Sequence, residues 1–361
     1  MINWPTKKLG EVADVVMGQS PPSSSYNERG EGLPFFQGKA EFGELYPTPV
    51  KYCVSPIRIA GAGDILMSVR APVGNINITK EKSCIGRGLG ALRAKKSVLE
   101  QMFLFYFMKK NEDNWSRLST GSTFSAIKGS SLRNFEVPLP PLQTQKQIVE
   151  RLDKIAESQK LNDGLIQKTD ELFQSLLHKE LNPVGRNWEI KKLKEISEIN
   201  PSKAEIKNLP ANTTVSFLAM ADVSEDAEIS NLQKRKLSEV KNGFTFFKDG
   251  DVLVAKITPC FENGKGAFVE NMTNGVGFGS TEFHVLRANQ DILLNKLLYY
   301  LVSDKRFRKI GAKFLTGSAG QHRVPTHYLE NFKVPLPPLK TQKLIVAKLS
   351  AVQDYKTQLL A

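Results

Sequence analysis

The sequence contains few of the residues that build metal centres, disulfide frameworks or membrane spans. Its three cysteines, Cys53, Cys84 and Cys260, are widely separated and form no C-x-x-C pair. An odd number at this spacing argues against both a disulfide framework and a zinc site. No apolar run approaches the ~20 residues that a membrane helix needs, and the first residues lack the charged and then apolar pattern of an export signal. These absences predict a protein of the reducing cytoplasm with no membrane partner.

Sequence signatures of catalysis are also lacking. There is no Asn-Pro-Pro-aromatic or Asp-Pro-Pro-aromatic run, which an amino-methyltransferase would show, and no G-x-x-x-x-G-K-[ST] phosphate loop. Glu189 and Lys191 resemble the acid and lysine of a metal-dependent nuclease, but the corresponding Pro5-Thr6-Lys7 has no acid. The spacing of His322 and His327 does not fit the i, i+4 pair of a zinc-binding helix. We expect no catalytic residue and no metal ligand, and we place the histidines, His284 among them, in loops or at the surface.

Positive charge is the strongest bias in the composition. The 361 residues include 50 Lys and Arg against 37 Asp and Glu, which gives a formal net charge of +13. Such a balance favours polyanionic partners, nucleic acid first, although enhanced solubility alone would also account for it. Hydrophobic residues make up 40% and charged residues 24%, as is typical of globular proteins. The length leaves room for two domains with separate cores.

The dominant feature of the sequence is a duplication. The run VPLPPLQTQK at 137–146 returns as VPLPPLKTQK at 334–343, and only one of its ten positions differs. Gly-Asp-Ile-Leu at 63–66 likewise resembles Gly-Asp-Val-Leu at 250–253, and Leu-Arg-Ala occurs at both 92–94 and 286–288. A spacing of about 190 residues is too long for a solenoid repeat and fits a whole domain plus a connector. We therefore predict a tandem of two related units.

Each unit has the same predicted order of elements. Strands come first, at 65–69 and 252–257, with glycine-rich loops between strands at 86–90 and 275–279. Helices follow at 98–110 and 292–307, where apolar and charged residues mix without breakers. The proline-rich run and a further helix end each unit. The predicted fold class is α/β (α+β), with two β-rich domains that also carry helices.

A long helix is predicted over 144–181, because this segment has no proline and only one glycine, Gly164. Its apolar residues recur every three or four positions, as in helices that pack on other helices. A second helix, about half as long, repeats this stripe at the end of the chain. The two helices are natural partners for each other, although each could instead lie on its own domain. The predicted seam consists of Ile148, Leu152, Ile155, Gln159, Asn162, Ile166, Thr169, Phe173 and Leu176, and of Ile345, Leu349, Val352 and Leu359, where Lys356 interrupts it.

These motifs resemble the specificity (S) subunit of type I restriction-modification systems. The resemblance rests on two unlike β-rich segments that each end in Val-Pro-Leu-Pro-Pro-Leu-x-Thr-Gln-Lys and a helix. Trp4–Val12 and its echo Trp188–Leu193 are also similar to the family's domain starts. The resemblance covers essentially the whole chain. The distal helix departs from the pattern, because family members usually carry a longer one, so we expect a shortened variant or a seam that a partner completes.

The resemblance implies a DNA sequence-recognition subunit without catalytic activity. Target-recognition domains at 1–142 and 184–339 would each bind one half of a bipartite DNA target. A central helix at 143–183 and a short distal helix at 340–361 would form an antiparallel coiled coil that sets the gap and docks two methyltransferase (M) subunits. Restriction-translocase (R) subunits would join the full complex, and S-adenosylmethionine, ATP and Mg would bind to these partners and not to this chain. The alternatives are a protein-interaction scaffold and a stand-alone DNA-modifying enzyme with an undetected active site.

Candidate DNA contacts are the polar and basic residues in loops near the predicted strands. Lys, Arg, Ser and Thr bind phosphates, whereas Arg, Asn and Gln recognise base edges. The stretch 32–56 has no counterpart in 209–244, as two different half-sites would require. For each residue the alternative is an ordinary solvated side chain. The candidates are Gln37, Lys39, Arg70, Asn75, Arg87, Ser122, Thr123 and Lys128 in the first unit, and Lys256, Thr258, Asn263, Lys265, Lys313, Ser318, Gln321, His322 and Arg323 in the second.

Overall fold

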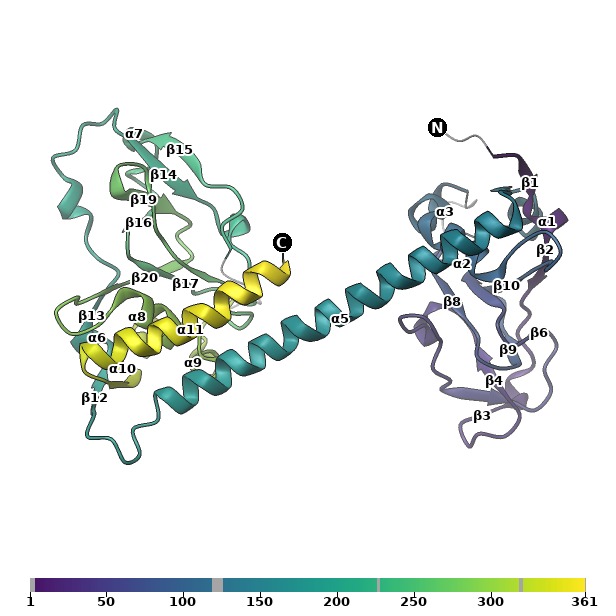
Figure 1. Cartoon of the computed structure of the whole chain (residues 1–361), viewed down its shortest axis with the longest axis horizontal. Helices are drawn as coiled ribbons and strands as arrows, with labels where there is room; N and C mark the ends of the chain where they lie inside the picture. Colours follow the sequence, from purple (N-terminus) through teal and green to yellow (C-terminus); the bar gives the residue numbers. More distant parts are fainter. Residues whose placement is uncertain (1–3, 119–125, 226–227, 318–320, 361) are drawn as a thin grey trace. The chain divides into compact units, whose positions relative to one another are not determined.

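The chain forms two compact units. The structure, a computed structural model, describes residues 4–118, 126–225, 228–317 and 321–360. The chain divides into unit 1, Met1–Lys160, and unit 2, Leu161–Ala361 (Figure 1). Both units mix strands and helices, which agrees with the predicted fold class. Within the described ranges, no helix is both long enough and apolar enough to cross a membrane.

Unit 1 is built on two main sheets. An antiparallel sheet has the strand order β2-β10-β7-β8, a five-stranded sheet has the order β3-β5-β4-β9-β6, and β1 pairs with β11. Every residue of β7 and β9 is buried, as expected of short apolar runs between turns. The strands are β1 Thr6–Lys8, β2 Ala13–Met17, β3 Tyr26–Asn27, β4 Leu33–Phe36, β5 Lys51–Cys53, β6 Ile59–Ala60, β7 Ile65–Ser68, β8 Ile76–Ile78, β9 Ser83–Ile85, β10 Leu89–Ala94 and β11 Glu136–Pro138. The helices are α1 Leu9–Val12, η1 Ser23–Ser25, η2 Lys39–Glu41, α2 Gln101–Lys110, α3 Glu112–Leu118, α4 Gly129–Arg133 and the start of α5, Leu142–Glu180.

Unit 2 repeats the antiparallel sheet and adds a different second sheet. The sheets have the orders β13-β20-β17-β18 and β15-β14-β19-β16, and β12 pairs with β21. The strands are β12 Glu189–Lys192, β13 Ser197–Ile199, β14 Thr214–Leu218, β15 Gln233–Lys236, β16 Thr245–Lys248, β17 Val252–Ala255, β18 Gly266–Phe268, β19 Val276–Gly279, β20 Phe283–Ala288 and β21 Lys333–Leu336. The helices are α6 Leu193–Ile196, η3 Lys203–Ile206, η4 Met220–Asp222, α7 Leu237–Val240, η5 Thr273–Gly275, α8 Asn295–Val302, α9 Lys305–Gly311, η6 Ala312–Phe314, α10 Thr326–Asn331 and α11 Leu339–Leu360.

The repeated Gly-Asp and Leu-Arg-Ala motifs form the same ion pair in both units. In unit 1, Arg93 of β10 donates from Nε and Nη2 to the two carboxylate oxygens of Asp64, at 2.7 and 2.8 Å. In unit 2, Arg287 of β20 makes the same two bonds to Asp251, both at 2.7 Å. The carboxylate side chains are only 4% and 1% exposed. A bidentate arginine on a buried carboxylate is one of the stronger polar contacts in proteins. In each unit it ties the strand that carries the arginine, β10 or β20, to the turn before the neighbouring strand, β7 or β17.

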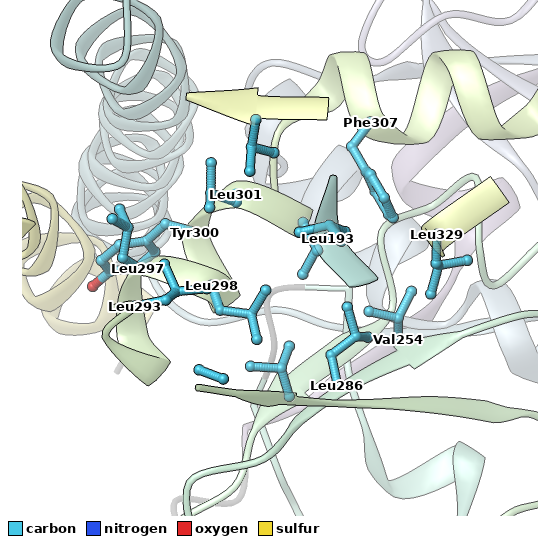
Figure 2. Packing of buried hydrophobic residues seen from close by; sticks show 14 of the residues in the cluster. Leu193, Val254, Leu286, Leu293, Leu297, Leu298, Tyr300, Leu301, Phe307 and Leu329 are labelled. Atoms are coloured by element: carbon cyan, nitrogen blue, oxygen red, sulfur yellow. The ribbon is translucent and has the colours of Figure 1, made fainter. Parts of the chain in front are cut away.

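The largest core of unit 2 joins its first sheet to the helices. Leu193 of α6, Val254 of β17 and Leu286 of β20 meet Leu297 and Leu298 of α8 in one buried cluster, which Figure 2 shows from close by. All five are fully buried. Full burial of a leucine or valine side chain contributes about 1.5–3 kcal/mol. The core therefore fixes the sheet from which the loops of this unit extend.

The second half of α5 runs antiparallel to α11 within unit 2. Residues that come later along α5 contact residues that come earlier along α11. The contacts are Asn162 Nδ2 to Leu359 O at 2.9 Å, Lys356 Nζ to Asp170 Oδ1 at 2.7 Å and Lys348 Nζ to Glu180 Oε1 at 2.6 Å. The apolar stripe also packs on the domain, because Phe173, Ile345 and Leu349 are buried in the core of unit 2. Phe173 meets Tyr300 of α8 edge-on, with the ring centroids 5.4 Å apart. In unit 2 the helices therefore both pair with each other and pack on the domain, so the two predicted alternatives occur together.

The remaining seam positions differ in their surroundings. Ile155, in the part of α5 that belongs to unit 1, is 54% exposed. Lys356, which interrupts the apolar stripe, is only 6% exposed, and Asp170 neutralises its charge. The other apolar seam positions are half-buried, namely Ile148, Leu152, Ile166, Leu176, Val352 and Leu359.

Three predictions about local structure were wrong. The glycine-rich segment expected as a loop at 275–279 is mostly strand β19, and Gly277 is needed there because a Cβ would collide with the ring of Phe247. The helix expected over 292–307 is two helices, since the side chain of Asp304 accepts a hydrogen bond from Arg306 N and starts α9. His284 is not a surface residue. It is 4% exposed in β20, and its ring nitrogen Nε2 lies 2.9 Å from Val324 O.

Candidate nucleic-acid interface

Several turns of unit 1 meet at one edge of its sheets. β2 and β7 both end where β10 begins, because Met17 lies opposite Gly90 and Ser68 opposite Leu89. β4 and β9 run parallel and end side by side. A backbone hydrogen bond of 3.0 Å joins the turn after β2 to the end of β9. The turns after β2, β4, β7 and β9 therefore form one surface, which we call the loop edge of unit 1.

Gln37 directly follows β4, and Arg87 follows β9 after one intervening residue, Gly86. Gly86 N donates to the carbonyl of Phe36 at 2.8 Å, which holds the two turns together. Arg87 N donates to Ser20 Oγ at 3.2 Å. A Cβ at position 88 would collide with the carbonyl of Gln37, so only glycine permits this approach. The side chains of Gln37 and Arg87 are both exposed.

The other described candidates of unit 1 lie at the same edge. Arg70 forms an antiparallel bridge with Ala126, two residues before Lys128, and both cationic side chains are exposed. Lys39 lies in η2, next to the turn after β4. Asn75 is half-buried, and its carbonyl accepts from Ser68 N at 2.9 Å. Ser122 and Thr123 lie outside the described residues.

Four basic side chains at this edge lack a neutralising partner in the described part of the chain. Among the residues that the structure describes, Lys39, Arg70, Arg87 and Lys128 have no ion-pair partner. Exposed cations that converge on one surface attract a polyanion and release its counterions on binding. Arg87 and Gln37 also have the donors that recognise guanine and adenine in the major groove.

Unit 2 forms its own loop edge with the same backbone hydrogen bonds. In each unit the residue that follows β7 or β17 donates a backbone hydrogen bond to the residue just before the neighbouring strand, β10 or β20. The carbonyl of the same residue accepts a hydrogen bond from a segment later in the chain. The bonds are Val69 N to Gly88 O at 2.8 Å and Ile127 N to Val69 O at 2.9 Å in unit 1, and Lys256 N to Glu282 O and Val324 N to Lys256 O, both at 2.8 Å, in unit 2. This match makes the two edges comparable position by position.

The side chains on the two loop edges differ at the matched positions. Glu282 stands where unit 1 has Gly88, and Thr281 stands where it has Arg87. Glu282 accepts from Arg323 Nη2 at 2.8 Å and from Arg323 Nε at 2.9 Å. The hydrogen bond from Arg323 lowers the pKa of Glu282, although partial burial opposes this change. Arg323, a predicted DNA contact, is thus already paired.

Internal partners also occupy other candidates of unit 2. Thr258 donates to Glu262 at 2.9 Å, and Asn263 donates to Glu225 at 2.6 Å. The carbonyl of His322 accepts from Thr258 N, so this residue lies at the same edge. The acidic partners of Asn263 and Arg323 lie 38 and 41 residues away along the chain, so local spacing does not reveal them. Lys265 is half-buried beside the edge, Gln321 is exposed, Lys313 lies on η6, and Ser318 is outside the described residues.

No group of three or more His, Cys, Asp or Glu side chains is placed to hold a metal ion in the described part of the chain.

Comparison with known proteins identifies a family. A family model described as the type I restriction modification DNA specificity domain matches residues 1–169 and again residues 185–361. A Methanocaldococcus jannaschii protein named as a type I restriction enzyme MjaX specificity subunit is 43% identical over 180 residues, which are 48% of this chain and 42% of that protein. The EcoAI specificity subunit of Escherichia coli is 39% identical over 173 residues, which are 48% of this chain and 29% of that protein.

The matches cover less than half the length of these two relatives. A solved structure of the type I restriction-modification S subunit from M. genitalium covers 99% of this chain and 93% of its own chain. It is 16% identical with a TM-score of 0.55, which indicates a shared fold.

Proposed function

The chain belongs to the family of type I restriction modification DNA specificity domains, and on this premise we propose that it is the DNA sequence-recognition subunit of a type I restriction-modification complex. Each unit binds one half of a bipartite target through its loop edge. The chain itself is not catalytic. S-adenosylmethionine, ATP and Mg bind to the methyltransferase and restriction subunits, and the complex works in the cytoplasm.

The observation that carries this proposal is the combination of one backbone frame with two different sets of side chains. The same hydrogen bonds hold both loop edges. On these edges, Arg87 and Gly88 of unit 1 correspond to Thr281 and Glu282 of unit 2. A protein that recognises two unlike half-sites needs the same docking geometry twice with different donors and acceptors, since base edges are distinguished by their hydrogen-bonding pattern.

Charge supports DNA as the ligand of these edges. The net charge is +13, and the basic side chains on the loop edge of unit 1 lack internal ion pairs among the described residues. Phosphate contacts supply much of the affinity of such interfaces, and binding falls steeply as salt rises. Each mismatched base pair costs about 1–3 kcal/mol.

The helices serve as the spacer and as the docking surface for two M subunits. In this proposal α5, a continuous helix of 39 residues, pairs with α11 as an antiparallel coiled coil that sets the unread gap between the half-sites. Leu161, Leu165 and Leu172 of α5 are 64%, 43% and 55% exposed, which provides apolar surface for a partner. The R subunits join through this assembly.

Methylome sequencing tests the proposal. Cells that carry the gene with its partner subunits should show methylation at a split, non-palindromic motif. Replacing residues 1–135 by the equivalent segment of a relative should change one half of that motif and leave the other half intact. If the modified positions do not depend on this chain, the proposal is wrong. An unchanged motif after the exchange would favour the protein-interaction scaffold, and methyl transfer by the purified chain alone would favour the stand-alone enzyme.

A further inference from the structure

Arg308 of α9 is a buried cation that has no carboxylate partner among the residues that the structure describes. Its side chain lies inside unit 2, and the residue is 7% exposed. Nη2 makes one long hydrogen bond, to Gly264 O at 3.5 Å. Within the described ranges, Nε and Nη1 have no hydrogen-bond partner. A guanidinium group has five N–H donors, so most of its donors are unused.

Two aromatic rings account for only part of this environment. The guanidinium carbon lies 5.0 Å from the ring centroid of Phe261 and 5.5 Å from that of Phe307. Such contacts stabilise a cation through the ring faces, but they provide no oxygen for the free N–H groups. Burial lowers the pKa of Arg308 to about 10, so the side chain is still charged at neutral pH. A buried charge without a polar partner is costly, and in proteins such groups are normally paired.

Arg308 is one of the residues that line a pocket of about 480 Å³, and all of these residues belong to unit 2. Its walls come from α9, from the turn after β17, from the second half of α5 and from α11. Lys305 and Lys309, one turn apart on α9, also line it, and both are exposed. Among the described residues neither has an ion-pair partner.

The carboxylates of the same pocket are engaged elsewhere. Asp170 pairs with Lys356 at 2.7 Å. Glu262 and Glu225 accept hydrogen bonds from Thr258 and Asn263, on the side of the β17 turn. No carboxylate of the described residues reaches Arg308. Arg308 therefore lines a polar pocket and lacks a negatively charged partner among the described residues. Its Nε and Nη1 are covered by protein atoms, so a bound anion reaches them only when the side chain turns toward the pocket.

We infer that this pocket binds a small oxyanion, with Arg308 at its base and Lys305 and Lys309 at its opening. The feature that the possible ligands share is a negatively charged oxygen that accepts hydrogen bonds from the guanidinium group. A phosphate group and a carboxylate group both provide it, and the experiment below separates them. Because α9, α5 and α11 all contribute to the walls, bound anion joins the recognition domain of unit 2 to its helix pair.

Thermal unfolding of the full chain tests the inference. Inorganic phosphate and acetate are titrated separately at constant ionic strength, with sodium chloride as the balance. At a tenfold excess of anion over its Kd, the Tm of the transition of unit 2 should have risen by about 3–6 °C, and it should go on rising with the logarithm of the anion concentration. R308M should fold, because methionine replaces a buried, unpaired charge by an apolar side chain of similar length, and its Tm should not respond to the anion.

Arg306→Met is the matched control. Arg306 lies on the same helix but pairs with Asp304 at 2.7 Å, so the loss of this arginine should leave the anion response unchanged. A response to phosphate alone identifies a phosphate ligand, and a response to acetate identifies a carboxylate ligand. Equal Tm responses in the wild type and R308M, or no rise in Tm with either anion, would overturn the inference. Should R308M fail to fold, the Nε–H resonance of Arg308 in the wild type provides a second measurement, since it must shift saturably with the same anion.

Discussion

Gln145 and Gln342 make the same three hydrogen bonds in unit 1 and unit 2. Both side chains are fully buried. In each unit the amide oxygen accepts from a backbone N–H just before the first long helix of the domain, and the amide nitrogen donates to two carbonyls, one of them a proline's. The partners of Gln145 are Glu100 N at 2.8 Å, Val98 O at 3.1 Å and Pro140 O at 2.8 Å, and those of Gln342 are Leu294 N at 2.9 Å, Ile292 O at 2.7 Å and Pro337 O at 2.8 Å. The repeated Thr-Gln-Lys motif thus attaches the helix that follows each proline-rich run, α5 in unit 1 and α11 in unit 2, to the domain that precedes it.

Gln145→Met should destabilise unit 1 by about 2–4 kcal/mol. The change keeps the length of the side chain but leaves one N–H and two carbonyls without their partner, and each buried polar group left unpaired costs about 1–3 kcal/mol. Denaturant unfolding followed by tryptophan fluorescence measures the loss. Gln143→Met, at an exposed position on the same helix, should stay within about 0.5 kcal/mol of the wild type. Similar losses in both variants would show that the hydrogen bonds of Gln145 do not matter.

Arg87→Ala should weaken binding to the target and relax sequence preference in one half-site. Loss of a bidentate arginine–guanine contact costs about 1–3 kcal/mol and removes discrimination at that base pair. Competition binding with duplexes that differ by one base pair measures both effects. Arg29→Ala is the control, because Arg29 lies in the turn before β4, away from the loop edge, and pairs with Glu31 at 3.2 Å. If Arg87→Ala lowers affinity for all sequences equally, Arg87 contacts only phosphate.

Lys128→Ala should weaken binding to all duplexes by a similar factor. A lysine that contacts phosphate carries no sequence information, and its loss reduces the slope of log K against log salt by about 0.9. A salt titration of DNA affinity gives this slope. Lys96→Ala is the comparison variant, since this exposed residue follows the far end of β10, and its slope should equal that of the wild type. An unchanged slope in Lys128→Ala would place Lys128 outside the interface.

The ion pair between Glu282 and Arg323 should make the stability of unit 2 depend on pH. The hydrogen bond from Arg323 lowers the pKa of Glu282 below its usual 4.5, so the folded state binds this proton less readily than the unfolded state. The contribution of the pair is therefore present above the unfolded pKa and is lost as the pH falls through the folded one. At pH 6, Glu282→Gln should be about 0.5–1 kcal/mol less stable than the wild type, as for a partly exposed pair.

The difference between the wild type and Glu282→Gln should shrink in thermal unfolding experiments as the pH falls below 4.5 towards the folded pKa. Glu31→Gln, which removes an exposed carboxylate in unit 1, should leave the transition of unit 2 unchanged at every pH. A constant difference between pH 6 and pH 3 would show that Glu282 contributes by packing and not by its charge.

Much of the secondary structure follows from local sequence. The strand predicted at 65–69 is β7 at 65–68, the strand predicted at 252–257 is β17 at 252–255, and the helix predicted at 144–181 is α5 at 142–180. These predictions succeeded because apolar runs between turns, and a long segment without breakers, leave the backbone few alternatives. β19 was missed because its glycines fit a close approach to Phe247, a residue distant in sequence.

The candidate site was only partly accessible from the sequence. Residue type and loop position selected Gln37, Arg70 and Arg87, which the structure brings to one loop edge, and their contact with DNA is still a prediction. The same criteria selected Arg323, although Glu282, 41 residues away, already pairs with it. Residue types and local spacing do not show which charge neutralises which, because such pairs form between separate segments after folding.

The tandem of two related units with unlike loops can be recognised from the amino-acid sequence, because a repeated run of residues is visible without coordinates. The roles of the repeated residues, by contrast, depend on long-range packing. Asp64 meets Arg93, and Gln145 meets the start of a distant helix, through contacts that exist only in the folded chain. Arg308 shows the same limit, since its sequence neighbours resemble any basic helix. Arg308 differs from a solvated arginine because it is buried and has no nearby carboxylate among the described residues. Both features are set by long-range packing.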